Sequence, residues 1–163
     1  MEENHPPELT SREPSVEDLV GLCRALNERQ AHYLVIGGFA MRAAGYDRRT
    51  MDVDLLIDTS PENERRVLDA LATLPDQAAL ELKIGEVQAY GVVRVADEIV
   101  VDLMKSAAGI VFAETKTETN VHIVDGTAIP FASPTLLWKM KVSTHREKDA
   151  PDLLFLRHLL QGN

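Results

Sequence analysis

The sequence predicts an α/β (α+β) fold, in which a mixed β-sheet has helices packed on one face and leaves its other face open. Short apolar runs rich in β-forming residues are separated by stretches with helical spacing of their apolar residues, as expected for a sheet covered by helices. Two of these runs also carry aspartates that alternate with apolar residues, so one face of the sheet is predicted to be polar. The composition, 45% hydrophobic and 26% charged, is that of a globular domain.

The 163 residues suit one domain, and we expect it to span residues 15–163. Residues 1–14 are rich in Glu and Pro and predict a flexible leader. The net charge of −9 argues against loose, charge-driven binding to nucleic acid. The single cysteine, Cys23, has no partner for an internal disulfide. No apolar run is long enough to span a membrane and no signal peptide is legible, so the expected location is cytoplasmic.

The chain begins with a predicted helix that Ser15 caps and that runs from residue 16 to about residue 30. A buried strand, Tyr33–Ile36, follows and is broken by Gly37 and Gly38. A short helix over residues 39–44 is predicted to end at Gly45. The next strand spans residues 51–57 and carries Asp52 and Asp54 on one face, with apolar residues on the other.

The second half of the chain continues this alternation. Residues 80–87 fit either a strand or an irregular connection, and residues 105–120 are predicted to be mostly loop. One pair of strands is predicted at 90–95 and 98–104 with a turn at 96–97, and a second pair at 121–124 and 128–131 around Asp125-Gly126. Helices are predicted at 61–74, 135–144 and 150–160.

Three aspartates are the strongest candidates for chemistry. Asp102 interrupts the apolar run Ile99–Met104, and its side chain is predicted to lie on the face of the strand away from Val101 and Leu103. Asp52 and Asp54 are likewise on the face of their own strand away from its apolar residues. We expect the two strands to be neighbours, with all three carboxylates turned to one cleft. Crowded carboxylates repel one another unless a cation neutralises them, and Mg²⁺ prefers carboxylate and phosphate oxygens. The alternative for Asp102 is a surface residue near a turn.

The stretch Gly37-Gly38, followed by Arg48-Arg49-Thr50-Met51-Asp52-Val53-Asp54, resembles the nucleotidyltransferase superfamily of the DNA polymerase β type. More narrowly, it is similar to small bacterial members related to the AbiEii toxins and the aminoglycoside nucleotidyltransferases. The C-terminal pattern Arg146-x-x-Asp149-x-x-Asp152-Leu153, after a helix containing Lys139 and Lys141, adds to this resemblance.

The resemblance implies an enzyme that transfers a nucleoside monophosphate from ATP or another NTP to a hydroxyl acceptor. It also implies that two metal ions, Mg²⁺ or Mn²⁺, take part in the reaction. Asp52, Asp54 and Asp102 would bind the metal, and Asp102 would help to activate the acceptor. The acceptor classes it allows are a small molecule, tRNA or a protein, and its pocket can also lie between subunits of a homo-oligomer. A second hypothesis is a nucleotide- or partner-binding module without turnover, such as one component of a toxin–antitoxin pair. A third is an unrelated α/β domain whose carboxylates are only surface charge.

The remaining candidates are nucleotide-binding residues. Gly37 and Gly38 are either a phosphate-binding turn or a plain tight turn. Arg48 either meets phosphate or pairs with Asp47, and Thr50 either takes part in binding or orients Asp52. Lys141, with Lys139 as the alternative, would neutralise the triphosphate. Arg146, Asp149 and Asp152 are predicted to be a structural ion-pair set, and Trp138 either a core residue or part of a base-stacking wall.

Overall fold

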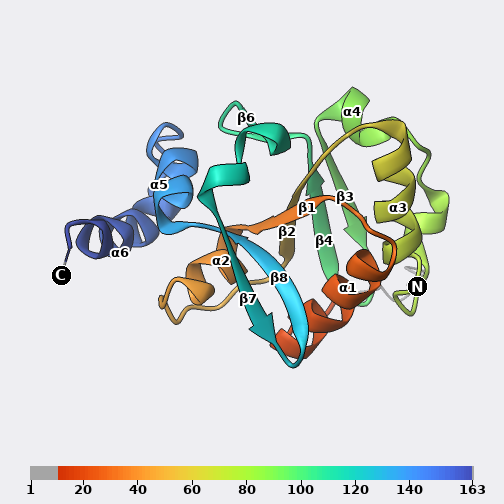
Figure 1. The fold of residues 1–163 in the computed structure, drawn as a ribbon, viewed down its shortest axis with the longest axis horizontal. Coiled ribbons are helices and arrows are strands. Elements are labelled where there is room, and N and C mark those ends of the chain that lie inside the picture. The colour runs from red at the N-terminus through yellow and green to blue at the C-terminus, as the bar shows by residue number, and fades with distance from the viewer. Residues whose placement is uncertain (1–10, 163) are drawn as a thin grey trace, which may run out of the picture.

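The computed structural model describes residues 11–162, and in this part of the chain the fold consists of six α-helices and a six-stranded mixed sheet (Figure 1). The helices are α1 (Val16–Glu28), α2 (Gly37–Ala43), α3 (Pro61–Leu71), α4 (Glu86–Tyr90), α5 (Pro134–Val142) and α6 (Ala150–Leu160). The strands of the main sheet are β1 (Tyr33–Ile36), β2 (Val53–Ile57), β3 (Val92–Ala96), β4 (Val100–Met104), β7 (Thr119–Val124) and β8 (Thr127–Ala132). A two-stranded sheet consists of β5 (Ser106–Ala107) and β6 (Ile110–Val111).

The strand order of the main sheet is β3-β4-β2-β1-β8-β7. The pairs β2–β4 and β1–β8 are parallel, whereas β1–β2, β3–β4 and β7–β8 are antiparallel. The register aligns Ile36, Asp54, Asp102 and Arg94 in one row across β1, β2, β4 and β3. Residues directly opposite each other in paired strands point to the same face. The two aspartate-bearing strands are therefore neighbours in a mixed sheet, as predicted.

Local signals in the sequence account for the element ends. Ser15 caps α1 in a capping box with Asp18, and Ser60 and Ser133 cap α3 and α5, each followed by a proline at the first helical position. The turn between β7 and β8 places Asp125 and Gly126 at positive φ, which is the requirement of a tight hairpin turn. The helix α1 packs against α3 and β8, and α2 packs against β1 and β2. Among the described residues, no helix is long and apolar enough to cross a membrane.

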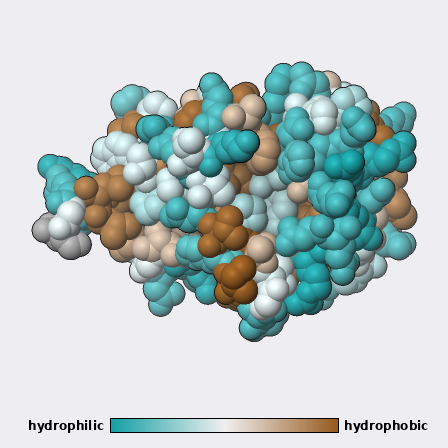
Figure 2. All heavy atoms as spheres, in the orientation of Figure 1, coloured by the Kyte–Doolittle hydropathy of each residue, from teal (hydrophilic) through white to brown (hydrophobic). Residues whose placement is uncertain are grey.

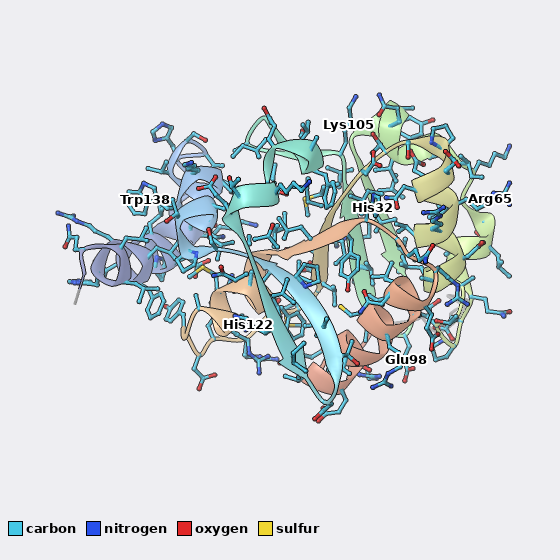
Figure 3. The ribbon with its side chains drawn as sticks, viewed as in Figure 1. His32, Arg65, Glu98, Lys105, His122 and Trp138 are labelled. Atoms are coloured by element: carbon cyan, nitrogen blue, oxygen red, sulfur yellow. The ribbon has the colours of Figure 1, made fainter. Side chains whose placement is uncertain are left out.

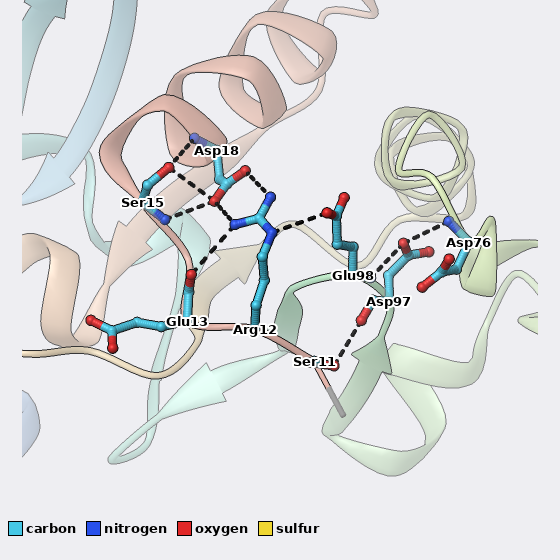
Figure 4. Close-up of polar contacts among 8 residues, drawn as sticks. All are labelled: Ser11, Arg12, Glu13, Ser15, Asp18, Asp76, Asp97 and Glu98. Carbon is cyan, nitrogen blue, oxygen red and sulfur yellow. Dashed lines mark hydrogen bonds and ion pairs between the residues drawn. The ribbon is translucent and has the colours of Figure 1, made fainter. Parts of the chain in front are cut away.

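The predicted leader is partly wrong, because residues 11–14 are held against the domain (Figure 4). Arg12 donates hydrogen bonds from its side chain to Asp18 and Glu98, and its backbone N–H donates to the Glu98 carbonyl. The Ser11 hydroxyl donates to the carbonyl of Asp97 in the turn between β3 and β4. Paired charges and backbone hydrogen bonds, together with the buried Pro14, therefore hold this segment. The rest of the leader, including His5, lies outside the described residues.

Other expectations need correction. For residues 80–87 the strand alternative is wrong and the irregular alternative is nearer, since a 3₁₀ turn (Ala78–Glu81) and the start of α4 are joined here by residues without regular structure. The segment 105–120, predicted as loop, also forms β5 and β6 and the 3₁₀ turns Phe112–Glu114 and Lys116–Glu118. The helix α6 has the predicted span, but it contacts mainly α5, so Leu156 is buried while Leu159 and Leu160 are exposed. Figure 2 shows hydrophobic side chains gathered over α6 and over β7, where Val121 and Ile123 are exposed.

Candidate functional site

Asp52, Asp54 and Asp102, here called the aspartate triad, converge on one point. Asp54 lies in β2 and Asp102 lies directly opposite it in β4, while Asp52 immediately precedes β2. One carboxylate oxygen from each residue can be chosen so that all three atoms lie within 4.8 Å of one another. The triad was predicted from strand alternation, and the parallel pairing of β2 with β4 is what brings its members together. It is the one group of three or more potential metal ligands found in residues 11–162.

Burial and crowding raise the pKa values of two members of the triad. The pKa of Asp54 is raised to about 7, mainly because burial penalises the charged form and also because Asp52 and Asp102 repel its charge. Burial is again the main cause of the raised pKa of Asp52, followed by repulsion from Asp102. The triad therefore carries an excess of negative charge that is costly in the metal-free protein.

Arg94 is the residue of this site that the sequence analysis missed. Its guanidinium donates from Nε to Oδ1 of Asp102 (2.9 Å), from Nη2 to Oδ2 of Asp102 (2.9 Å) and from Nη2 to Oδ2 of Asp52 (3.2 Å). A turn at residues 96–97 would have placed Gly91 opposite Asp102. In the structure the turn is longer, and Arg94 is the partner of Asp102. An arginine inside the apolar run Val92–Ala96 was the available signal.

Gly37 and Gly38 begin α2 beside the triad, and neither position has room for a side chain. A Cβ atom at Gly37 would lie 2.1 Å from Oδ2 of Asp54, and Gly37 has φ of +70°, which L residues rarely adopt. A Cβ atom at Gly38 would lie 2.4 Å from Oγ1 of Thr50. The glycines thus let the α2 backbone approach the strand that carries Asp54, and they keep this side of the triad open.

Thr50 and Arg48 lie in the loop that leads into β2. Oγ1 of Thr50 donates a hydrogen bond to the backbone carbonyl of Asp52 (2.9 Å). This contact agrees with the alternative in which Thr50 orients Asp52. Arg48 pairs with Asp152 and not with Asp47, and its contact with phosphate stays a prediction. Its Nε lies 2.9 Å from Oδ1 of Asp152, and its Nη2 donates to Oδ2 of the same residue. The loop is therefore tied to α6, although Arg48 also lines the cleft described below.

Lys141 belongs to a second cluster of charges, here called the α5–α6 ion-pair cluster. The cluster confirms the predicted ion-pair set of Arg146, Asp149 and Asp152, and adds Lys141 and Arg48 to it. Nζ of Lys141 lies 3.2 Å from Asp149 and 3.0 Å from Asp152. Burial by itself raises the pKa of Asp149, but Lys141 and Arg146 outweigh it and the pKa is lowered. The fallback residue, Lys139, pairs with Glu118 instead.

A cleft of about 620 Å³ connects the two clusters. All eight candidate site residues predicted from the sequence line it: Gly37, Gly38, Arg48, Thr50, Asp52, Asp54, Asp102 and Lys141. Its other lining residues include the basic side chains Arg49, Arg146 and Lys148, and the apolar side chains Met104, Leu137 and Met140. Trp138 is not among the described residues that line the cleft; it packs against the core from α5 (Figure 3), which favours the core alternative.

The triad fits a divalent cation such as Mg²⁺ or Mn²⁺. Its donors are carboxylate oxygens, which these hard cations prefer, and three of them lie close enough to share a site. Histidine and cysteine take no part in the group, so the donor set does not favour zinc.

Comparison with known protein families and with curated proteins finds no match for this chain. Among solved structures, the chain is similar to a protein from Thermotoga maritima that is provisionally named a nucleotidyltransferase. The two chains are 15% identical, the TM-score is 0.57, and the alignment covers 98% of this chain and 100% of the other. At this identity the likeness shows the fold. The protein thus has the nucleotidyltransferase-like fold predicted from its sequence, over nearly its whole length.

Proposed function

We propose that the protein is a metal-dependent nucleotidyltransferase that transfers a nucleoside monophosphate from an NTP to a hydroxyl acceptor. The observation that carries the proposal is the convergence of Asp52, Asp54 and Asp102 at one end of a cleft in a nucleotidyltransferase-like fold. The AbiEii-like assignment within the superfamily is part of the proposal and is supported by two sequence patterns, Gly37-Gly38 with the stretch from Arg48 to Asp54, and the Arg146-to-Leu153 pattern.

The proposed reaction depends on positioning and charge neutralisation, as phosphoryl-group transfer generally does. Asp52, Asp54 and Asp102 would hold Mg²⁺ or Mn²⁺, which when bound neutralises phosphate charge and lowers the pKa of a coordinated hydroxyl. Asp102 would orient the acceptor hydroxyl and accept its proton as the hydroxyl oxygen bonds to the α-phosphorus, while the bond from the α-phosphorus to the bridging oxygen breaks and pyrophosphate leaves. Thr50 fixes the backbone of Asp52 through its hydrogen bond to the Asp52 carbonyl, which positions the first carboxylate of the triad.

The rest of the cleft suits the substrate. Backbone N–H groups at Gly37 and Gly38 are proposed to receive phosphate oxygens, since neither residue has a side chain to block their approach. Lys141, Arg146 and Lys148 add positive charge to the lining of the cleft, although Lys141 is already paired with Asp149 and Asp152. Leu137 and Met140 provide apolar surface for a base. The volume of about 620 Å³ lies within the usual range of small-molecule sites.

One observation favours the second hypothesis, a nucleotide- or partner-binding module without turnover. Arg94 already neutralises part of the triad, and a permanently held arginine would replace the metal.

The proposed function is tested by incubation of the protein with each α-labelled NTP and Mg²⁺ or Mn²⁺, together with pools of RNA, protein and small-molecule acceptors. Wild-type protein is expected to transfer label to one pool, and Asp54→Asn to lose the transfer. Asp69→Asn, the same chemical change on an exposed position of α3, is the matched control and is expected to retain it. No transfer to any pool by the wild-type protein would favour the non-catalytic module.

A further inference from the structure

Arg94 binds two of the three carboxylates that the proposed metal needs. Its fork makes two contacts of 2.9 Å with both oxygens of Asp102, and a third contact of 3.2 Å with Asp52. Paired N–H donors on one carboxylate form the strongest kind of ion pair between side chains. In the metal-free protein, therefore, a protein cation holds the oxygens that a divalent cation would take.

The sheet builds this arrangement directly. β3 is the edge strand beside β4, and Arg94 lies opposite Asp102 in their antiparallel pairing, on the face that carries Asp54. The pairing fixes the backbone of Arg94 and leaves its side chain 60% exposed, while the Asp102 side chain is only 11% exposed. The arginine side chain is thus free to leave, whereas the aspartate it holds cannot move far. Lys141, the buried cation of the α5–α6 ion-pair cluster, is by contrast only 10% exposed.

We infer that Arg94 is a positioning residue that holds Asp52 and Asp102 in the free protein and is displaced when metal arrives together with a nucleoside triphosphate. The inference rests on the proposed function and adds an order of binding to it. A metal ion alone must compete with the guanidinium for the same oxygens, so it binds weakly. A triphosphate brings negative charge into the cleft, which attracts both the metal and the released guanidinium. Metal and nucleotide therefore raise each other's affinity by the same factor.

Mn²⁺ binding, measured by electron paramagnetic resonance without nucleotide, tests the inference. Arg94→Ala is expected to bind Mn²⁺ about tenfold more tightly than wild type, which corresponds to about 1.4 kcal/mol. Arg94→Lys keeps the charge but loses the fork, so its affinity is expected to lie between the two. Arg65→Ala is the matched control: it removes one positive charge from an exposed position of α3, away from the residues that line the cleft (Figure 3).

A second measurement repeats the titration with a non-hydrolysable ATP analogue. The analogue is expected to raise the Mn²⁺ affinity of the wild type by a larger factor than that of Arg94→Ala, because part of the wild-type gain is release of the arginine. The melting temperature of metal-free Arg94→Ala is expected to fall, since the triad then loses its one direct cation among the described residues. If this variant does not fold, Arg94→Lys still gives the comparison.

The outcomes separate the inference from the proposed function. If Asp54→Asn loses Mn²⁺ binding while Arg94→Ala binds like the wild type, the triad is a metal site and the inference about Arg94 is wrong. If the wild type, Asp54→Asn and Arg94→Ala all bind Mn²⁺ equally weakly, the triad is no metal site and the proposed function fails with it. Tighter binding by Arg94→Ala, with no change in Arg65→Ala, supports both.

Discussion

The aspartate triad and the α5–α6 ion-pair cluster line the same cleft but differ in charge balance. In the second cluster, two buried carboxylates, Asp149 and Asp152, are surrounded by Lys141, Arg48 and Arg146. In the triad, two of the three carboxylates, Asp52 and Asp102, share one direct partner among the described residues, the exposed side chain of Arg94. The pKa values follow this difference, since that of Asp149 is lowered and those of Asp52 and Asp54 are raised. Carboxylates that are matched by cations join two helices, whereas carboxylates in excess of their cations are suited to receive a metal ion.

The largest expected loss of stability is in the α5–α6 ion-pair cluster. Asp152→Ala removes the carboxylate that Lys141 and Arg48 share, and it leaves a buried lysine short of a partner. Loss of one partner of a buried ion pair typically costs about 3–5 kcal/mol. We expect the free energy of unfolding, measured by urea denaturation, to fall by that amount. Glu147→Ala, an exposed neighbour, is the control; if both variants unfold alike, the cluster does not stabilise the junction of the last two helices.

In the triad, removal of a carboxylate charge is expected to raise the free energy of unfolding rather than lower it. Asp54→Asn removes a charge from a crowded group, so metal-free protein should gain roughly 1–3 kcal/mol of stability at pH 8, less than the full pKa shift implies because the site is partly open to solvent. The folded pKa of Asp54, about 7, exceeds its unfolded value, so the wild type loses stability as the pH rises from about 4 through 7. The gap between variant and wild type should therefore close near pH 4. A variant less stable than wild type at pH 8 would make the aspartate structural.

The smallest change in stability is expected when the exposed ion pair between Arg12 and Asp18 is broken. The pKa of Asp18 is lowered to about 2, chiefly by its hydrogen bonds from Arg12. A lowered folded pKa contributes stability above the unfolded value of about 4, and this is lost as the pH falls toward 2. Arg12→Ala should thus lower the melting temperature slightly at pH 7 and not at pH 2. An equal loss at both values would point to the contact with Glu98 and to packing.

Local signals allowed most of the fold to be predicted from the sequence. Capping serines, prolines at first helical positions and the Asp125-Gly126 turn mark the element ends, and the structure places those elements within a few residues of the prediction. The failures are non-local. Residues 11–14, predicted as part of a flexible leader, are held by partners far along the chain.

In the candidate site too, residues set by a local pattern were predicted and a residue set by distant contacts was not. Asp52, Asp54 and Asp102 were recognised because alternation within each strand sets the face of a side chain. Arg94 was missed because its position opposite Asp102 depends on the length of the turn between β3 and β4. That turn is set by Asp97, whose carboxylate accepts hydrogen bonds from the backbone N–H groups of Asp76, Ala78 and Glu98. Contacts of this kind, from a loop distant in sequence, leave no pattern in a strand.

The measurement that tests the central claim most directly is calorimetry of ATP binding to the wild-type protein, once with Mg²⁺ and once with EDTA. The triad and a chain of net charge −9 repel a triphosphate, and Mg²⁺ reverses this by bridging carboxylate and phosphate oxygens. The account predicts that ATP binds at least tenfold more tightly with Mg²⁺, a difference of about 1.4 kcal/mol or more. Equal affinity in Mg²⁺ and in EDTA would contradict it, because the triad would then take no part in binding the nucleotide.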